Sequence, residues 1–281
     1  MSYVADLYSH SPYARGTSPQ LTFENMALWA RIKGIDLLAT GDFTHPAQLA
    51  EIRGKLYEIG DGLYELDGIR FVLGTEVNCS AEQAGRLRRV HVLVFAPDLK
   101  TVDSINSSLD HNGKLASAGR PTVHLTPRDL LETLLGIDER CFIIPAHMWT
   151  PHFGLYGEKS GFDSLPECFG DLASFVPVIE TGLSSDPAMN WRVPSLDGVS
   201  IGSFSDAHSL PKLGRELPCS WANQPTTACW THSGTKKFST RWKCSRRKAS
   251  TTTPGTTSAV FACLHRRPLP QVSAAPNAAA N

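Results

Sequence analysis

The chain has 281 residues and a formal net charge of zero, and this length permits one large α/β domain with or without an appendage. The neutrality conceals two unlike parts. All 27 acidic residues and 18 of the 27 Lys and Arg lie in residues 1–217, whereas residues 218–281 contain nine basic residues and no acid. The acidic first part argues against a simple basic DNA clamp. It does not exclude nucleic acid, because bound divalent cations supply positive charge at a phosphate.

The sequence carries no sign of export or membrane insertion. Its first residues contain no basic region followed by an apolar stretch, so we expect no signal peptide. No apolar run approaches the roughly 20 residues of a membrane helix, so we expect no membrane partner. The seven cysteines, at positions 79, 141, 168, 219, 229, 244 and 263, form no CxxC pair. This usage indicates reduced cysteines in a cytoplasmic protein.

Short apolar runs alternate with helical patterns along the first part of the chain. Strands are predicted at 3–7, 35–40, in the run that ends at Glu76, and at 90–95, 141–145, 176–180 and 199–204. Helices are predicted at 23–33 with Thr22 as N-cap and Gly34 at the end, at 47–59, and from Thr126-Pro127 to Leu135. Turns near 60–68 predict a short hairpin. The alternation favours a parallel α/β sheet that is closed or nearly closed into a barrel.

Six stretches place a histidine or carboxylate after an apolar run: 6–10, 41–45, 74–76, 89–91, 145–147 and 205–208. In a barrel of parallel strands the carboxyl ends of all strands converge on one face, so we expect these side chains to meet. Imidazoles and carboxylates together suit zinc, manganese or iron. The pattern predicts two or three metal ions at one face. Glu76 could bridge two ions, and Asp206 and His208 could serve adjacent ones.

Such a cluster implies hydrolysis of a phosphomonoester or a phosphodiester. Divalent ions provide a hydroxide nucleophile near neutral pH, and paired ions stabilise the attacking and leaving oxygens of a phosphoester. No general-base side chain is then required. The sequence has no GxxxxGK[ST] motif, which argues against a helicase-type NTPase.

Two long loops rich in glycine and aromatic residues, 149–163 and 182–192, follow later strands. Loops at the ligand-bearing face of such a fold commonly shape the substrate site. Loops that only pack against one another are the alternative. For a substrate role, the candidate aromatic side chains are Phe153, Tyr156, Phe162 and Trp191, and the candidate basic side chains are Lys159 and Arg192.

The composition changes abruptly after Leu217. Residues 218–281 are rich in Ser and Thr, lack acids and show no periodicity, which predicts an irregular, disordered basic tail. A second interpretation is a shifted reading frame. Reading the tail one base earlier with ordinary codons yields two CxxC pairs about twenty residues apart, the spacing of a structural zinc ribbon. We therefore expect a domain at 1–217 followed by an irregular segment at 218–281 that is out of frame.

Residues 1–217 resemble a PHP (polymerase and histidinol phosphatase) domain, and within that superfamily the endonuclease Q family of DNA-repair nucleases. The stretches that carry the resemblance are 11–18, 39–46, 153–157, 182–186 and 204–209. The resemblance implies a distorted (βα)7 barrel with a trinuclear metal site. It also implies nicking of DNA on the 5′ side of deaminated bases. Members of the family continue into a zinc-binding segment, which the shifted frame would restore.

Carried over position by position, the resemblance implies the metal ligands His10, Asp42 or His45, Glu76, His91, His147, Asp206 and His208. Among them, Glu76, Asp206 and His208 are the candidates for catalysis, and the ions would be zinc, manganese, iron or magnesium. The chain departs from the family at Tyr8, where the Asp-x-His-x-His motif has its first histidine. A phenol with a pKa near 10 is a poor ligand at neutral pH. We therefore expect weaker occupancy of the metal that His10 also binds, and reduced or absent activity.

The sequence thus favours a metal-dependent endonuclease whose partner is DNA containing deaminated bases. Substrate recognition would require extrusion of the damaged base into a pocket. Two alternatives stay open at this point. One is a phosphatase acting on small phosphomonoesters, and the other is a catalytically inactive metal-binding remnant, which Tyr8 and the unusual tail both favour.

Overall fold

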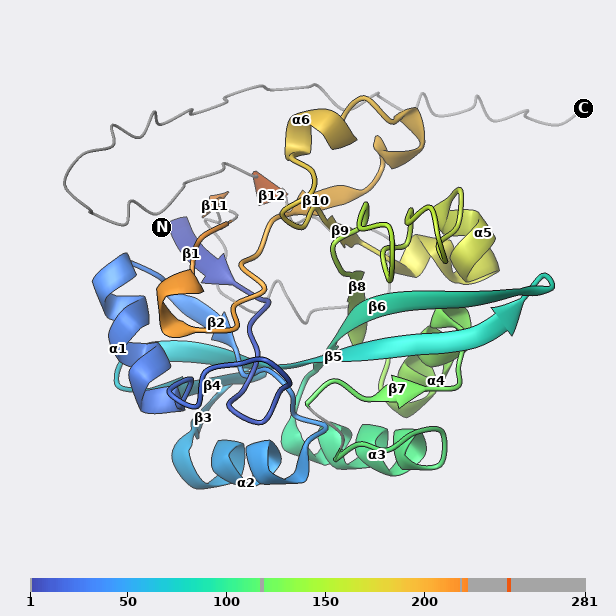
Figure 1. Cartoon of the computed structure of the whole chain (residues 1–281). Coiled ribbons are helices and arrows are strands. Elements are labelled where there is room, and N and C mark those ends of the chain that lie inside the picture. Colours follow the sequence, from blue (N-terminus) through green and yellow to red (C-terminus); the bar gives the residue numbers. More distant parts are fainter. Residues whose placement is uncertain (1, 117–118, 218, 222–241, 244–281) are drawn as a thin grey trace, which may run out of the picture.

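The computed structural model describes residues 2–116, 119–217, 219–221 and 242–243. Figure 1 shows a curled sheet with helices α1 to α4 along its outer side and α6 near the far end of the molecule, beside β10. None of the described helices combines the length and the apolar character needed to cross a membrane.

The helices follow the predicted order with two differences. Thr22 accepts a hydrogen bond from the N–H of Asn25, and Thr126 does the same for Asp129, so both predicted N-caps are confirmed. The second helix ends at Lys55 and not at 59, because β3 begins two residues later. Three further helices, α3, α5 and α6, were not predicted. The bounds are α1 (Phe23–Lys33), α2 (Pro46–Lys55), α3 (Leu99–Asp110), α4 (Pro127–Ile137), α5 (Leu165–Phe169) and α6 (Pro187–Asn190).

The main sheet is mixed. Strands β1, β2 and β5 lie parallel in that order, β7 pairs with β5 in parallel, and the remaining pairs are antiparallel. The bounds are β1 (Ser2–Asp6), β2 (Leu37–Ala39), β3 (Tyr57–Gly60), β4 (Leu63–Leu66), β5 (Ile69–Gln83), β6 (Arg86–Ala96), β7 (Thr122–Val123), β8 (Phe142–Pro145), β11 (Cys219–Trp221) and β12 (Trp242–Lys243). Strands β9 (Val178–Glu180) and β10 (Ser200–Gly202) form a separate parallel pair.

The largest departure from the sequence prediction is the hairpin of β5 and β6. Glu76 pairs with Leu93 and His91 with Asn78 in its antiparallel ladder, so these two candidate ligands lie inside strands. The prediction that every ligand follows the end of a parallel strand is wrong for this pair. Both turn residues, Ala84 and Gly85, have positive φ (53° and 72°), as a two-residue hairpin turn requires. Alanine rarely adopts such a backbone, which is why the turn was not recognisable.

The inner face of the curled sheet is covered by a packed cluster of apolar side chains. Side chains from β1, β2, β5, β6, β8 and β9 pack into a single cluster that includes Ala5, Leu37, Val72, Phe95 and Ile144. Inward residues from successive strands meet in this way inside a barrel. Among the described residues, however, no ladder joins β8 to β9, and no closed barrel is formed. The fold is therefore mixed α/β, and its sheet curls around a barrel-like interior.

Only five residues of the predicted irregular tail are described. Cys219–Trp221 forms β11, which pairs antiparallel with β1, and Trp242–Lys243 forms β12 beside it. These short strands differ from the irregular structure expected there. The rest of 218–281, and with it the reading-frame interpretation, lies outside the described residues.

Gly41 provides a test of how tightly the site's loops are packed. Its φ is 65°, and a Cβ at this position would lie 2.6 Å from the carbonyl oxygen of Ser9. Gly41→Ala should therefore lower the free energy of unfolding by about 1–3 kcal/mol, measured by chemical denaturation. Gly54→Ala is the matched control, because a Cβ there meets nothing within 4 Å inside α2. That variant should match or slightly exceed the parent in stability. Equal stability of both variants would contradict the packing described.

Candidate metal centre

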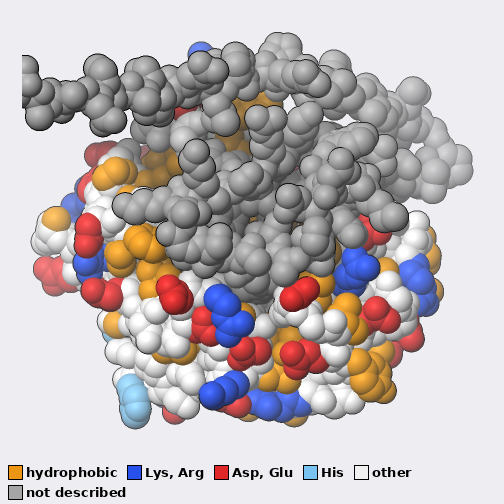
Figure 2. Space-filling model, turned by 180° about the vertical axis from the view of Figure 1, so that it is seen from behind, with side chains coloured by type: hydrophobic (Ala, Val, Ile, Leu, Met, Phe, Trp, Pro, Cys, Tyr) orange, Lys and Arg blue, Asp and Glu red, His pale blue; other side chains and the backbone are white. Residues whose placement is uncertain are grey.

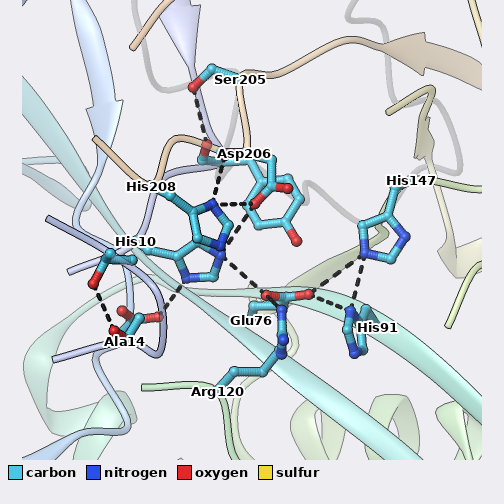
Figure 3. A network of polar contacts seen from close by, with 12 residues as sticks. His10, Ala14, Glu76, His91, Arg120, His147, Ser205, Asp206 and His208 are labelled. Atoms are coloured by element: carbon cyan, nitrogen blue, oxygen red, sulfur yellow. Dashed lines mark hydrogen bonds and ion pairs between the residues drawn. The ribbon is translucent and has the colours of Figure 1, made fainter. Parts of the chain in front are cut away.

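Two groups of potential ligands face one another across a buried carboxylate. Figure 3 shows Glu76 in the middle, with His91 and His147 on one side and His10, Asp206 and His208 on the other. The first group is Glu76, His91 and His147, and the second is His10, Asp206 and His208; in each, three ligand atoms lie within 4.8 Å of one another. Oε1 of Glu76 lies 2.7 Å from Nδ1 of His91, and its Oε2 lies 3.4 Å from Nε2 of His10. Glu76 therefore touches both groups, as expected of a bridging carboxylate.

In the first group, hydrogen bonding identifies which nitrogen of His147 is free. The hydroxyl of Thr150 donates to the carbonyl oxygen of His147 at 2.9 Å, so it accepts from Nδ1 of the same residue at 2.7 Å. This leaves the Nε2 lone pair directed at Nδ1 of His91, 3.0 Å away, and at Oε1 of Glu76, 3.8 Å away. A neighbour that fixes the tautomer in this way is typical of metal-ligating histidines.

The donor set of the first group fits a divalent cation. Oε1 of Glu76 is buried and has no aligned hydrogen-bond partner, despite the nearby imidazoles. Burial lowers the pKa of His91, which favours the neutral imidazole that a metal requires. Burial alone would raise the pKa of Glu76, but His91, His147 and Arg120 hold it well below its ordinary range. Zinc bonds of about 2.0–2.2 Å in a tetrahedron separate ligand atoms by roughly 3.4 Å, within the spread of distances observed here.

In the second group, His10 is held between carboxylates. Its Nδ1 lies 3.2 Å from Oδ1 of Asp42, whose Oδ2 accepts a hydrogen bond of 2.7 Å from the N–H of Ser11. Its Nε2 lies 3.2 Å from Oδ1 of Asp206. Burial lowers the pKa of His10, but Asp42, Asp206 and Glu76 outweigh this effect and raise it to about 10. Carboxylates that stabilise a proton on His10 also stabilise a divalent cation bound in place of that proton.

The backbone is strained at three of the candidate ligands. Asp42, His147 and Asp206 have φ values of 46°, 32° and 45°. Each follows the end of a strand, where the chain must turn sharply to direct its side chain toward the centre. A non-glycine residue with positive φ costs on the order of 1–3 kcal/mol and persists where the surroundings enforce it, commonly at functional sites. The strain supports a functional role for this set of residues.

Two buried carboxylates that the sequence analysis did not assign bind the backbone of the loops that carry the candidate ligands. Asp6 accepts hydrogen bonds from the N–H of Ser205 at 3.0 Å and the N–H of Gly214 at 2.8 Å, and also from the Ser205 hydroxyl. It thereby fixes the loop that carries Asp206 and His208. Asp6 ends an apolar run just as the ligands do, so the signal was present in the sequence.

The second supporting carboxylate is Glu180, at the end of β9. It accepts hydrogen bonds from the N–H of His147 at 2.5 Å, of Gly182 at 2.8 Å and of Phe204 at 3.4 Å. Burial raises the pKa of Glu180 to about 7. The side chain thus ties together the ends of β8, β9 and β10. Its signal was again an acidic residue after a buried strand, Val178-Ile179-Glu180.

Tyr8 lies among the ligands but offers no ligand atom suited to them. It is 2% exposed, and its hydroxyl has no well-aligned hydrogen-bond partner among the described residues. The ring centroid lies 5.6 Å from that of His10 and 6.4 Å from that of His147, one residue in each group. Burial, together with Glu76 and Asp206, raises the pKa of Tyr8 well above its ordinary value. A neutral phenol therefore stands where the two groups approach each other.

Neither of the two alternatives at 42–45 belongs to a ligand group in the described part of the chain, and their surroundings differ. Asp42 contacts His10, as described above. His45 instead stacks on Tyr13 at 4.9 Å with an interplanar angle of 7°, and it belongs to neither group of ligands among the described residues. The position of Asp42 behind Nδ1 of His10 fits a carboxylate that orients the imidazole.

The predicted substrate residues lie on the two long loops, which contact each other. The indole N–H of Trp149 donates to Oδ1 of Asn190 at 2.8 Å. Tyr156 packs on the core, whereas Trp191 is 45% exposed. Lys159 and Arg192 are exposed, and Lys159 lies 3.3 Å from Glu158. Of the six predicted residues, Phe153 lines the cavity of about 270 Å³ beside the ligand groups, and the other five do not. Arg15 and Arg120, which the sequence analysis missed, also line it.

Comparison with known proteins is consistent with this geometry. No family model matches the chain. The uncharacterised protein YqxK of Bacillus subtilis is 34% identical over 194 residues, which are 66% of this chain and 47% of YqxK. The crystal structure of the lesion-specific endonuclease PfuEndoQ from Pyrococcus furiosus superposes with a TM-score of 0.71 at 31% identity, over 80% of this chain and 54% of that one.

A second structure of endonuclease Q, in complex with a 27-mer duplex that has an abasic lesion at the active site, gives the same TM-score at 32% identity. PsfC from Pseudomonas syringae, at 17% identity and a TM-score of 0.52, shares the fold. The chain spans about half the length of YqxK and of the endonuclease Q chains. In both sequence and fold, the resemblance of this chain to endonuclease Q is confirmed.

Proposed function

We propose that this chain is a metal-dependent phosphoesterase that cuts DNA beside a damaged base. The observation that carries the proposal is the pair of histidine–carboxylate groups that share Glu76. The similarity to endonuclease Q, one structure of which contains duplex DNA with an abasic lesion, supports DNA as the substrate. Deaminated bases are the lesion class that we propose for this chain.

Two or three divalent ions would be held by the two groups, with zinc, manganese, iron and magnesium as candidates. Bound there, the ions would supply the nucleophile and stabilise the negative charge on the phosphate. Glu76 would link the two groups, while Asp206 and His208 would bind on the opposite side from His91 and His147. Asp42 would hold His10 in the orientation that directs Nε2 inward. Water is restricted at this point, because Glu76 and His10 are almost fully buried.

DNA would approach the ligand groups along the long loops. The loop after β9 exposes Leu183, Met189 and Trp191, which are 55%, 54% and 45% exposed. Exposed apolar side chains grouped in this way commonly mark a binding surface, and an extruded base needs an aromatic partner. Lys159 and Arg192 are exposed and would meet phosphates, whereas the packed ring of Tyr156 supports the loop. The face shown in Figure 2 intersperses basic and acidic side chains over its described part, as expected of a surface that does not bind DNA.

The proposal extends to the domain organisation. Residues 1–217 would form the catalytic unit, with the distorted (βα)7 barrel of PHP proteins, and 218–281 would be an appended segment read out of frame. A metal-binding remnant with little or no activity is the second candidate function. The observation that favours it is the neutral phenol of Tyr8 between the two ligand groups.

Removal of one imidazole should abolish metal binding by the group of Glu76, His91 and His147. His147→Ala should lose about one zinc ion per chain, because only two ligand side chains remain there. Metal content after zinc loading and dialysis, measured by mass spectrometry, checks this. His152→Ala is the matched control, since His152 is exposed on the same loop. Equal metal content in both variants would argue against a metal site at His147.

Restoring an imidazole at position 8 should improve the centre. Tyr8→His should bind more metal than the parent chain and should hydrolyse a small chromogenic phosphodiester faster in manganese, because a phenol that stays protonated gives way to a ligand. Metal content and initial rates are compared at equal protein concentration. A parent chain that already holds a full set of ions and turns over as fast as the variant would refute this expectation.

Trp191 provides a test of lesion recognition. Trp191→Ala should reduce cleavage of inosine-containing duplex DNA by about fivefold or more, the effect of losing one base–aromatic stack. Hydrolysis of the small phosphodiester should be unchanged. Phe175→Ala is the control, because Phe175 is similarly exposed but lies outside both long loops. Equal losses on both substrates would contradict a base-reading role, and turnover of sugar phosphates without DNA cleavage would indicate a phosphatase.

A further inference from the structure

The cavity beside the ligand groups has an unusual lining. Three of its side chains are histidines of the two groups, and the others include Arg15, Arg120, Asn78 and Thr122. Two arginines and no carboxylate line it, although Glu76, Asp42 and Asp206 lie close behind. From this lining we infer that the cavity is an anion pocket in which Arg15 and Arg120 hold a phosphate of the substrate strand. The inference rests on the proposed function and names the part of DNA that the pocket binds.

The ion pair with Glu76 fixes the position of Arg120 but engages only part of its hydrogen-bonding capacity. Its Nη1 donates to Oε2 of Glu76 at 2.9 Å. A guanidinium has five N–H donors in a planar fork, and within the described part of the chain this is the single hydrogen bond that the Arg120 fork makes. The side chain is 37% exposed, whereas that of Glu76 is 1% exposed. The remaining donors therefore face the cavity, and their fixed geometry suits two oxygens of a phosphate.

Arg15 adds a second positive charge to the lining of the same cavity. Its side chain is exposed, and within the described ranges it makes no ion pair. The segment that carries Arg15 packs against the one that carries Arg120: Gly119 has φ 75°, and a Cβ there would lie 2.8 Å from Cα of Ala14. This close approach keeps the two arginines at one opening. Because no described residue forms an ion pair with Arg15, its guanidinium is available to an anionic ligand in the cavity.

The remaining lining limits what the pocket can hold. Phe153 forms one wall, with its ring stacked on His91 at a centroid distance of 4.4 Å and an angle of 16°. Asn78 donates to the hydroxyl of Thr122 at 3.0 Å on another side. The volume of about 270 Å³ is below the roughly 300–1,000 Å³ of pockets for drug-sized ligands. A phosphate with its adjoining sugar fits this description, and a phosphate held here would lie directly beside His10 and His91.

Binding of DNA by the metal-loaded full chain tests the inference. Fluorescence anisotropy with a labelled abasic duplex in calcium would compare the parent with Arg120→Ala, Arg15→Ala and Arg120→Lys over a range of salt concentrations. Each alanine variant should bind about tenfold more weakly and show a salt dependence reduced by about one phosphate contact. Arg120→Lys should remain clearly weaker than the parent, because lysine lacks the planar fork. Arg86→Ala, at the distant tip of the β5–β6 hairpin, should bind as the parent does.

Two further measurements separate the possible failures. Metal content, measured on every variant, should be unchanged; loss of metal in Arg120→Ala with full rescue by lysine would show that Arg120 acts only through Glu76, and would overturn its phosphate role. Titration with inorganic phosphate is the second. Arginine-dependent phosphate binding without DNA binding would support the pocket while refuting DNA as the substrate. Unchanged affinity for both DNA and phosphate in the alanine variants would overturn the inference.

Discussion

The candidate site is organised around the buried carboxylate of Glu76, on which the lone pairs of several imidazoles converge. Its two oxygens meet imidazoles from opposite sides, and the nitrogen of His147 that faces them has been freed by Thr150. A carboxylate in this position is 2% exposed and would be costly without compensating positive charge. The guanidinium of Arg120 provides such charge in the described structure, and the surrounding carboxylates raise the pKa of His10. Divalent ions would provide it more effectively, which is the physical reason to read these residues as a metal centre.

The supporting framework is as informative as the ligands. Asp6 and Glu180 accept hydrogen bonds from backbone N–H groups of the loops that carry candidate ligands, and Asp42, His147 and Asp206 adopt positive φ. A protein selected for stability alone would have little use for buried carboxylates and strained turns. Such features persist where the geometry of a site requires them. The same logic applies to Tyr8, whose buried, unpaired hydroxyl is a cost that no described contact offsets.

Much of this organisation was predictable from sequence because it is encoded locally. Caps at Thr22 and Thr126 mark helix starts, and His147, Asp206 and His208 follow short buried strands as expected. The long hairpin was not predictable, because its turn at Ala84 and its ladder depend on pairing between strands and not on local preference. Arg120 was missed for a related reason: it lies 44 residues from Glu76 in sequence, and only the folded chain brings the two together.

Anomalous X-ray diffraction from crystals grown with zinc or manganese would test the central claim most directly. We expect one peak bounded by Glu76, His91 and His147, and a second bounded by His10, Asp206 and His208. Such peaks would establish that the converging lone pairs are metal ligands. The account would be contradicted if metal were found at full occupancy elsewhere while these side chains kept the contacts with one another described above.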